Sequence, residues 1–195
     1  MGESKSLICF LFIVSLSFIT SCMRYPTYTP PMALNYNPED NTQTINKDFN
    51  AVWTALIEYA SSSFFAIKTF EKDSGLLTLQ FGSGNPSEYV NCGFLKSVTW
   101  NREGSLLYLI QSSGISHADL DGNMNIFVKP IATNVTQIKI NARYILLIND
   151  GQFQNTWAFD TGGSDTKQLS AIVVTCQPTH KAEQTILEGI KKIAQ

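Results

Sequence analysis

The most constraining feature of this chain is an alternation of apolar and polar residues between positions 137 and 148. Apolar side chains recur at every second position. Because successive side chains of a strand point to opposite faces, this period of two predicts a long strand with one dry and one wet face. Such a strand is typical of an antiparallel sheet covered on one side. The apolar set is Ile138, Ile140, Ala142, Tyr144, Leu146 and Ile148, and the polar set begins with Gln137, Lys139, Asn141 and Arg143.

Two amphipathic stripes predict the helices that cover this sheet. The first runs from Phe49 to Ala60 behind a cap at Asn46 or Asp48, and its apolar residues fall three and four positions apart. The second runs from Ala182 to Ala194 behind Thr179. We therefore expect an α+β fold, a curved antiparallel β-sheet with an N-terminal and a C-terminal helix packed on one face.

Shorter apolar runs predict further strands, among them residues 64–72, 77–81, 89–98, 106–111 and 168–176. The segment 116–123 contains His117, Asp119 and Asp121, and it briefly resembles a metal loop or a His-Asp pair. An EF-hand counted from Asp119 would need its bidentate acid at position 130, where a proline stands. A hairpin turn at Asp121-Gly122 accounts better for the same residues.

The N-terminus is typical of a bacterial lipoprotein precursor. Residues 7 to 19 are almost all apolar, but a membrane-spanning helix needs about 20 such residues, so the run fits the hydrophobic region of a signal peptide. Ile19-Thr20-Ser21-Cys22 then resembles a lipobox. We expect residues 1–21 to be removed and Cys22 to carry the lipid; the alternatives are a signal peptide cut elsewhere and an uncleaved membrane anchor. The N-myristoylation pattern that begins at Gly2 is fortuitous in front of such a segment.

The resemblance to lipoproteins also implies a location. Met23 follows the cysteine, in place of the aspartate associated with inner-membrane retention. In a Gram-negative host this implies an outer-membrane protein, held by its lipid, whose domain lies in the periplasm or at the cell surface.

Residues 22–41 are expected to form a lipidated, proline-rich tether, followed by a single domain over residues 42–195. Four prolines in this segment favour an extended backbone that does not pack. The tether is either a spacer or a partner-binding strap, in which Tyr25, Tyr28 and Tyr36 would supply apolar contact area.

Cysteine usage agrees with export. Once Cys9 is removed and Cys22 is lipidated, Cys92 and Cys176 remain. Two cysteines in an oxidising compartment most simply form one disulfide, and a pair of buried free thiols is the alternative.

Few classes of chemistry find support in the sequence. Net charge is −2 and Lys and Arg do not cluster, which argues against nucleic-acid binding. No nucleophile elbow, zinc-binding helix or phosphate loop occurs, and the second histidine, His180, is expected to be exposed at the start of the last helix. We expect no enzyme activity, no metal and no cofactor.

Several short motifs resemble outer-membrane lipoproteins related to BamC. Asp48-Phe49-Asn50-Ala51-Val52-Trp53, Phe65-Ala66-Ile67 and Asp73-Ser74-Gly75-Leu76-Leu77 are similar to the opening of their helix-grip domains, and Cys176-Gln177-Pro178-Thr179 precedes a similar terminal helix. The resemblance covers roughly residues 42 to 195. It implies a helix-grip fold and an accessory role in the machinery that assembles outer-membrane proteins. The chain departs from BamC in having room for one such domain and in its cysteine pair.

These observations favour a non-enzymatic envelope lipoprotein that acts as an accessory or interaction subunit of an outer-membrane or periplasmic assembly. Its expected partners are the membrane, through the lipid anchor, and an envelope protein. The alternative is a small-molecule or lipid carrier, because a helix against a curved sheet can leave an apolar cavity.

Overall fold

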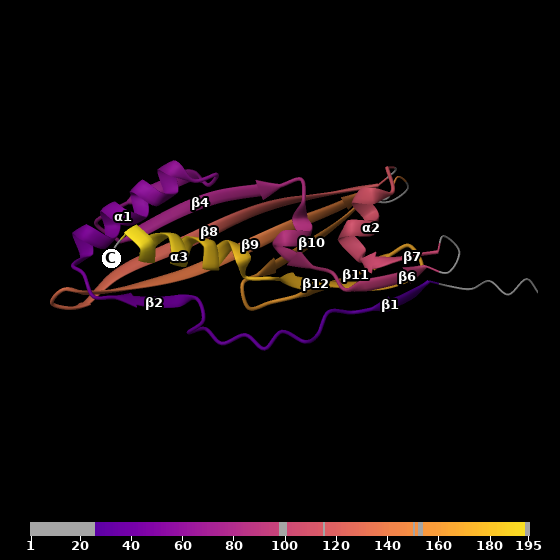
Figure 1. Ribbon diagram of the computed structural model, residues 1–195, viewed down its shortest axis with the longest axis horizontal. Coiled ribbons are helices and arrows are strands. Elements are labelled where there is room, and N and C mark those ends of the chain that lie inside the picture. The colour runs from indigo at the N-terminus through magenta and orange to yellow at the C-terminus, as the bar shows by residue number, and fades with distance from the viewer. Residues whose placement is uncertain (1–25, 98–100, 115, 150, 152–153, 194–195) are drawn as a thin grey trace, which may run out of the picture.

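The computed structural model describes residues 26–97, 101–114, 116–149, 151 and 154–193 (Figure 1). Among these residues, the central sheet is antiparallel and has six strands. Its two longest strands, β8 (His117–Ala132) and β9 (Val135–Asn149), form a hairpin whose turn is Thr133-Asn134. Asn134 has a φ of 56°, a backbone conformation that asparagine tolerates well. The strand order is β10-β9-β8-β4-β3, with β2 also pairing with β9; the other bounds are β2 (Thr42–Ile45), β3 (Ala66–Glu71), β4 (Leu76–Ser83) and β10 (Gln154–Asp160).

The predicted alternation of apolar and polar residues is confirmed in β9. Its six predicted apolar residues are all buried, with exposures of 0 to 2%, and the polar residues between them face outward or are half-buried. This strand therefore divides a packed face of the sheet from a wet one.

Helices α1 (Phe49–Ser62) and α3 (Lys181–Ile193) contact each other and lie against β8 and β9 (Figure 1). The side chain of Asp48 caps α1 by accepting the backbone N–H of Ala51 at 3.1 Å. The predicted stripes supply most of the buried residues of both helices, among them Trp53, Leu56, Ile186 and Ile190.

Two small sheets complete the described residues. One has the order β1 (Thr27–Thr29), β6 (Phe94–Ser97), β7 (Arg102–Ser105), and the other β11 (Asp165–Leu169), β12 (Ile172–Pro178), β5 (Val90–Asn91). A 3₁₀ turn, η2 (Pro86–Glu88), precedes β5, and a helix, α2 (Leu106–Ser112), follows β7. The indole of Trp157 in β10 donates to the carbonyl of Val174 at 3.1 Å, which joins the second small sheet to the central one.

The expected α+β fold built on one curved sheet is wrong. The described residues are mostly β, with 50% in strands and 23% in helices, and their strands form three sheets accompanied by three scattered helices. The predicted strand 89–98 breaks at Gly93, whose φ is 79° and where a Cβ would lie 2.4 Å from the carbonyl oxygen of Thr29. Because the chain turns there, β5 and β6 join different sheets.

The predicted strand 106–111 is also wrong, because these residues form α2. Ser105 caps this helix by accepting the N–H of Tyr108 at 3.3 Å. Leu106, Leu107 and Ile110 are buried on one side, a spacing that fits a helix. A short apolar run does not distinguish a strand from a buried helix by its periodicity.

The hairpin turn predicted at Asp121-Gly122 is wrong as well. Both residues lie within β8, where Gly122 pairs with Phe81 of β4. A Cβ on Gly122 would lie 2.2 Å from the ring of Phe81. The glycine is therefore present to make room for that ring and not to make a turn.

The described molecule is elongated along the β8–β9 hairpin (Figure 1). The hairpin turn and α1 lie toward one end. Helix α2 and strands β6 and β7 lie toward the other, which is also where β1 begins.

Candidate functional site

The predicted lipidation residue, Cys22, lies outside the described residues, as do the signal segment and Tyr25. Within the part of the chain that the structure describes, no helix is long and apolar enough to cross a membrane.

The predicted disulfide is confirmed: Cys92 is bonded to Cys176. Cys92 follows β5, and Cys176 lies in β12, which pairs with β5. Both residues are buried, with exposures of 2% and 0%. The bond therefore fastens two segments that are 84 residues apart in the sequence.

Tyr28, a candidate tether residue, binds beside this disulfide. Its hydroxyl accepts the backbone N–H of Thr175 at 3.0 Å and lies within donating distance of the carbonyl oxygens of Cys92, at 3.1 Å, and Thr175, at 3.2 Å. Burial raises the pKa of the Tyr28 phenol, and the hydrogen bond from the Thr175 backbone partly opposes that rise. The Tyr28 hydroxyl thus hydrogen-bonds with backbone groups of Thr175, in β12, and of Cys92.

Tyr36, the second tether residue that the structure describes, lies against the start of α3. Its ring stacks on His180, with centroids 5.6 Å apart and planes 10° from parallel. Gly162 lies beneath the same ring, and a Cβ there would come within 2.6 Å of it. Between the two tyrosines, Gln177 donates to the carbonyl of Met32 at 2.9 Å.

Residues 26–36, which we call the strap, are therefore packed along the domain. The expectation that this part of the tether does not pack is wrong. Tyr28 and Tyr36 do supply contact area, but their observed contacts are with their own chain. The sequence signal was present, since tyrosines recur among the prolines, but nothing in the sequence names the surface they contact.

A buried polar cluster lies at the beginning of α3, and sequence reasoning missed it. Glu183 has no exposed surface; its carboxylate accepts the Tyr144 hydroxyl at 2.5 Å and the Thr161 hydroxyl at 2.9 Å. Thr161 in turn accepts the backbone N–H of Ala142 at 2.6 Å. Burial, followed by the charge of Glu183, holds the pKa of the Tyr144 phenol far above its usual range. The stripe of α3 places Glu183 beside apolar positions, which is the one sign of this cluster in the sequence.

Each of the two histidines lies near one acidic side chain. His180, expected to be exposed, is half-buried under Tyr36, and its Nδ1 is 3.9 Å from Glu183. His117 is 3.7 Å from Asp119 on the exposed face of β8. Among the described residues, no three of His, Cys, Asp and Glu are grouped as metal ligands.

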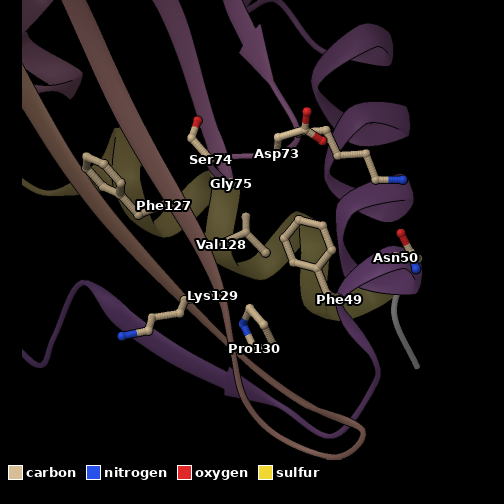
Figure 2. A pocket seen from close by; sticks show the side chains of 10 residues that line it. Phe49, Asn50, Asp73, Ser74, Gly75, Phe127, Val128, Lys129 and Pro130 are labelled. Atoms are coloured by element: carbon tan, nitrogen blue, oxygen red, sulfur yellow. The ribbon is translucent and has the colours of Figure 1, made fainter.

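An open groove of about 710 Å³ lies near the hairpin turn, between the start of α1 and the end of β8 (Figure 2). The rings of Phe49 and Phe127 and the side chain of Pro130 give it apolar walls, and Lys72, Asp73 and Lys129 give it charge. Gly75 closes the β3–β4 turn against β8, where its carbonyl accepts the N–H of Val128 at 2.8 Å. Its φ of 66° and the 2.2 Å that would separate a Cβ from the Val128 oxygen exclude a larger residue.

The chain matches no family model, no curated protein and no solved structure. The resemblance to BamC therefore stays a prediction.

Proposed function

We propose that this protein is a lipid-anchored envelope protein that acts by docking another protein and not by catalysis. Cys22 would hold it at the outer membrane, with the domain in the periplasm or at the cell surface. The accessory role implied by the resemblance to BamC belongs to the same proposal.

The disulfide between Cys92 and Cys176 is the observation that carries the proposal. Disulfides persist in oxidising compartments and are rare in the cytosol. A buried disulfide in a chain that contains the lipobox-like residues 19–22 supports export, and export through such a segment supports lipidation.

The groove near the hairpin turn supports the docking role. Phe127 is 44% exposed and Ile131, at the adjacent end of β8, is 49% exposed. Exposed apolar side chains beside charged ones are typical of a protein-binding surface. The interface between helices and sheet contains fully buried side chains of Leu56, Ile126, Ile140 and Ile186, which favours docking over the carrier alternative.

Lipidation is tested by replacing Cys22 with serine in cells labelled with palmitate. The wild-type protein should incorporate label and fractionate with the outer membrane, while Cys22→Ser should accumulate as unlabelled, unprocessed or mislocalised protein. A variant that is still processed, labelled and membrane-bound would disprove lipidation at Cys22.

Docking is tested by purifying the wild-type protein in mild detergent and identifying what accompanies it. Phe127→Asp should release a groove-bound partner, because it places a charge on the apolar wall. Val173→Asp is the matched control, since Val173 is an apolar strand residue in β12 that is 55% exposed, somewhat more than Phe127. Equal retention of the partner by both variants would place docking elsewhere.

A further inference from the structure

The strap places the lipidation residue close to one end of the domain. Only residues 23–25 lie between Cys22 and Pro26, where the described chain begins. An extended chain advances at most about 3.6 Å per residue, so the Cα atoms of Cys22 and Pro26 are at most about 14 Å apart. Had residues 22–41 been a free spacer, this limit would have been several times larger.

The strap enters the fold at an extreme of the molecule. Thr27 in β1 pairs with Lys96 in β6, and Lys96 in turn pairs with Glu103 in β7. Figure 1 shows β1, β6 and β7 together with α2 at one end of the long axis. We call the surface formed by these four elements the proximal end.

The side chains of the proximal end suit the interface of a bilayer. Tyr108 in α2 is 62% exposed and Phe94 in β6 is 44% exposed, and aromatic side chains favour the headgroup region of membranes. Arg102 and Lys96 are both exposed; Lys96 pairs with Glu103 at 3.1 Å. The cations can approach lipid phosphates.

The groove lies at the opposite end of the molecule. Strand β8 starts beside α2 and runs for 16 residues to the hairpin turn. At about 3.3 Å per residue, this is a length of about 50 Å. If the lipid is attached near β1, the groove can therefore lie far from the bilayer.

We propose that the proximal end is a membrane-contacting surface, and that the strap fixes the domain on the bilayer with the groove presented away from it. The proposal rests on the proposed lipidation of Cys22. Its partner is the phospholipid surface itself, recognised by exposed aromatic rings and cations next to the lipid-bearing residue. The strap thus sets an orientation, which a flexible spacer would not do.

The experiment uses the full-length lipidated protein, purified from membranes and reconstituted in vesicles of phosphatidylethanolamine and phosphatidylglycerol. A thiol-reactive fluorophore is attached to Arg102→Cys at the proximal end or, as the matched control, to Thr133→Cys in the β8–β9 turn. A quencher is carried on the lipid headgroups. The fluorophore at position 102 should lose most of its emission, and the one at position 133 should keep nearly all of it. Equal quenching at both positions, or none at either, would overturn the proposal.

Two further measurements separate the causes of failure. Mass spectrometry of the N-terminal peptide reports the lipid on Cys22, so absence of the lipid would refute the proposed lipidation and not the geometry. A long Gly-Ser segment inserted after Arg24 lies outside the described residues and lengthens the connection. This insertion should restore most of the emission at position 102, and unchanged quenching would contradict control by the short connection.

Discussion

At the scale of single residues, the cost of burying a charge means that the carboxylate of Glu183 requires hydrogen-bond donors. Removing a carboxylate from water is costly unless hydrogen bonds replace the solvent. Tyr144 and Thr161 supply two such bonds, and β9 and the residues after β10 hold these donors in place. The cluster therefore ties the first turn of α3 to the central sheet through polar contacts inside an apolar core.

Replacing Glu183 with alanine should lower the free energy of unfolding by about 2 to 4 kcal/mol, because it leaves two buried hydroxyls without their acceptor and opens a small cavity. Urea unfolding at neutral pH measures the change. Glu188→Ala, on the exposed side of the same helix, should change the value by no more than about 0.5 kcal/mol. If the two variants are equally stable, the cluster does not hold α3.

The raised pKa of Tyr144 predicts a loss of stability at alkaline pH. The folded protein keeps the phenol proton where the unfolded chain, with a pKa near 10, releases it. The stabilisation is therefore complete below about pH 10 and decreases above it, by about 1.4 kcal/mol per pH unit for this one group. Tyr28, Tyr59 and Tyr89 also have raised pKa values and add to the slope.

Tyr144→Phe should remove its share of that slope. Denaturant unfolding at several pH values between 9 and 11 would reveal it, with each variant compared with its own stability at pH 8 to cancel the lost hydrogen bond. A slope identical to that of the wild-type protein would mean that Tyr144 does not keep its proton in the folded state.

Tyr28→Phe should release the strap at its first contact. The variant loses the hydroxyl that serves Thr175 and Cys92, so partly buried backbone groups lose a hydrogen-bond partner, at a cost of about 1 kcal/mol or more. Limited proteolysis should then cut within residues 26–36 faster than in the wild-type protein. Tyr36→Phe is the control, because the Tyr36 hydroxyl accepts a longer hydrogen bond, at 3.4 Å, from the side chain of Asn41. Resistance equal to that of the wild type would show that the hydroxyl does not hold the strap.

At the scale of elements, α1 depends on one large side chain. Trp53 is 3% exposed and its ring lies between Phe49 and Phe70, with centroids 5.8 Å and 5.4 Å away. Trp53→Ala should therefore destabilise the protein by about 3 to 5 kcal/mol, as measured by thermal or urea unfolding. Thr54→Ala, at the exposed neighbouring position, should be nearly neutral. A Trp53→Ala protein as stable as the wild type would place this ring outside the core.

Elements with a clear period were predictable, and elements defined by a single contact were not. The period of two in β9 and the helical spacing in α1 and α3 predicted these elements correctly, because each element buries a long row of apolar side chains. By contrast, Gly93 breaks a predicted strand because a distant carbonyl, that of Thr29, leaves no room for a side chain. Gly122 resembles a turn residue in the sequence, but its lack of a side chain makes room for the ring of Phe81 on another strand. Neither contact is visible before the strands are paired.

At the scale of the whole molecule, one part of the candidate site could be predicted from the sequence and another could not. Cys92 and Cys176 could be paired by elimination, because they remained once Cys9 was assigned to the expected signal peptide and Cys22 to the expected lipid anchor. The surfaces that Tyr28 and Tyr36 contact could not be predicted from the sequence, since β12, Gly162 and His180 come together only in the folded chain. The packing of the strap along the domain is therefore apparent only at this scale.

The disulfide should stabilise the whole molecule by constraining the unfolded chain. Its partners are 84 residues apart, and in the chain-entropy model a loop of that length contributes roughly 4.5 kcal/mol. Reduction, or the double variant Cys92→Ala/Cys176→Ala, should lower the melting temperature markedly. The strap should stay in place, because Tyr28 bonds to backbone atoms of Cys92 and Thr175 and not to sulfur. Thiol counting on denatured, unreduced mature protein is the direct measurement. Two free thiols, or equal stability with and without reductant, would contradict a structural bond.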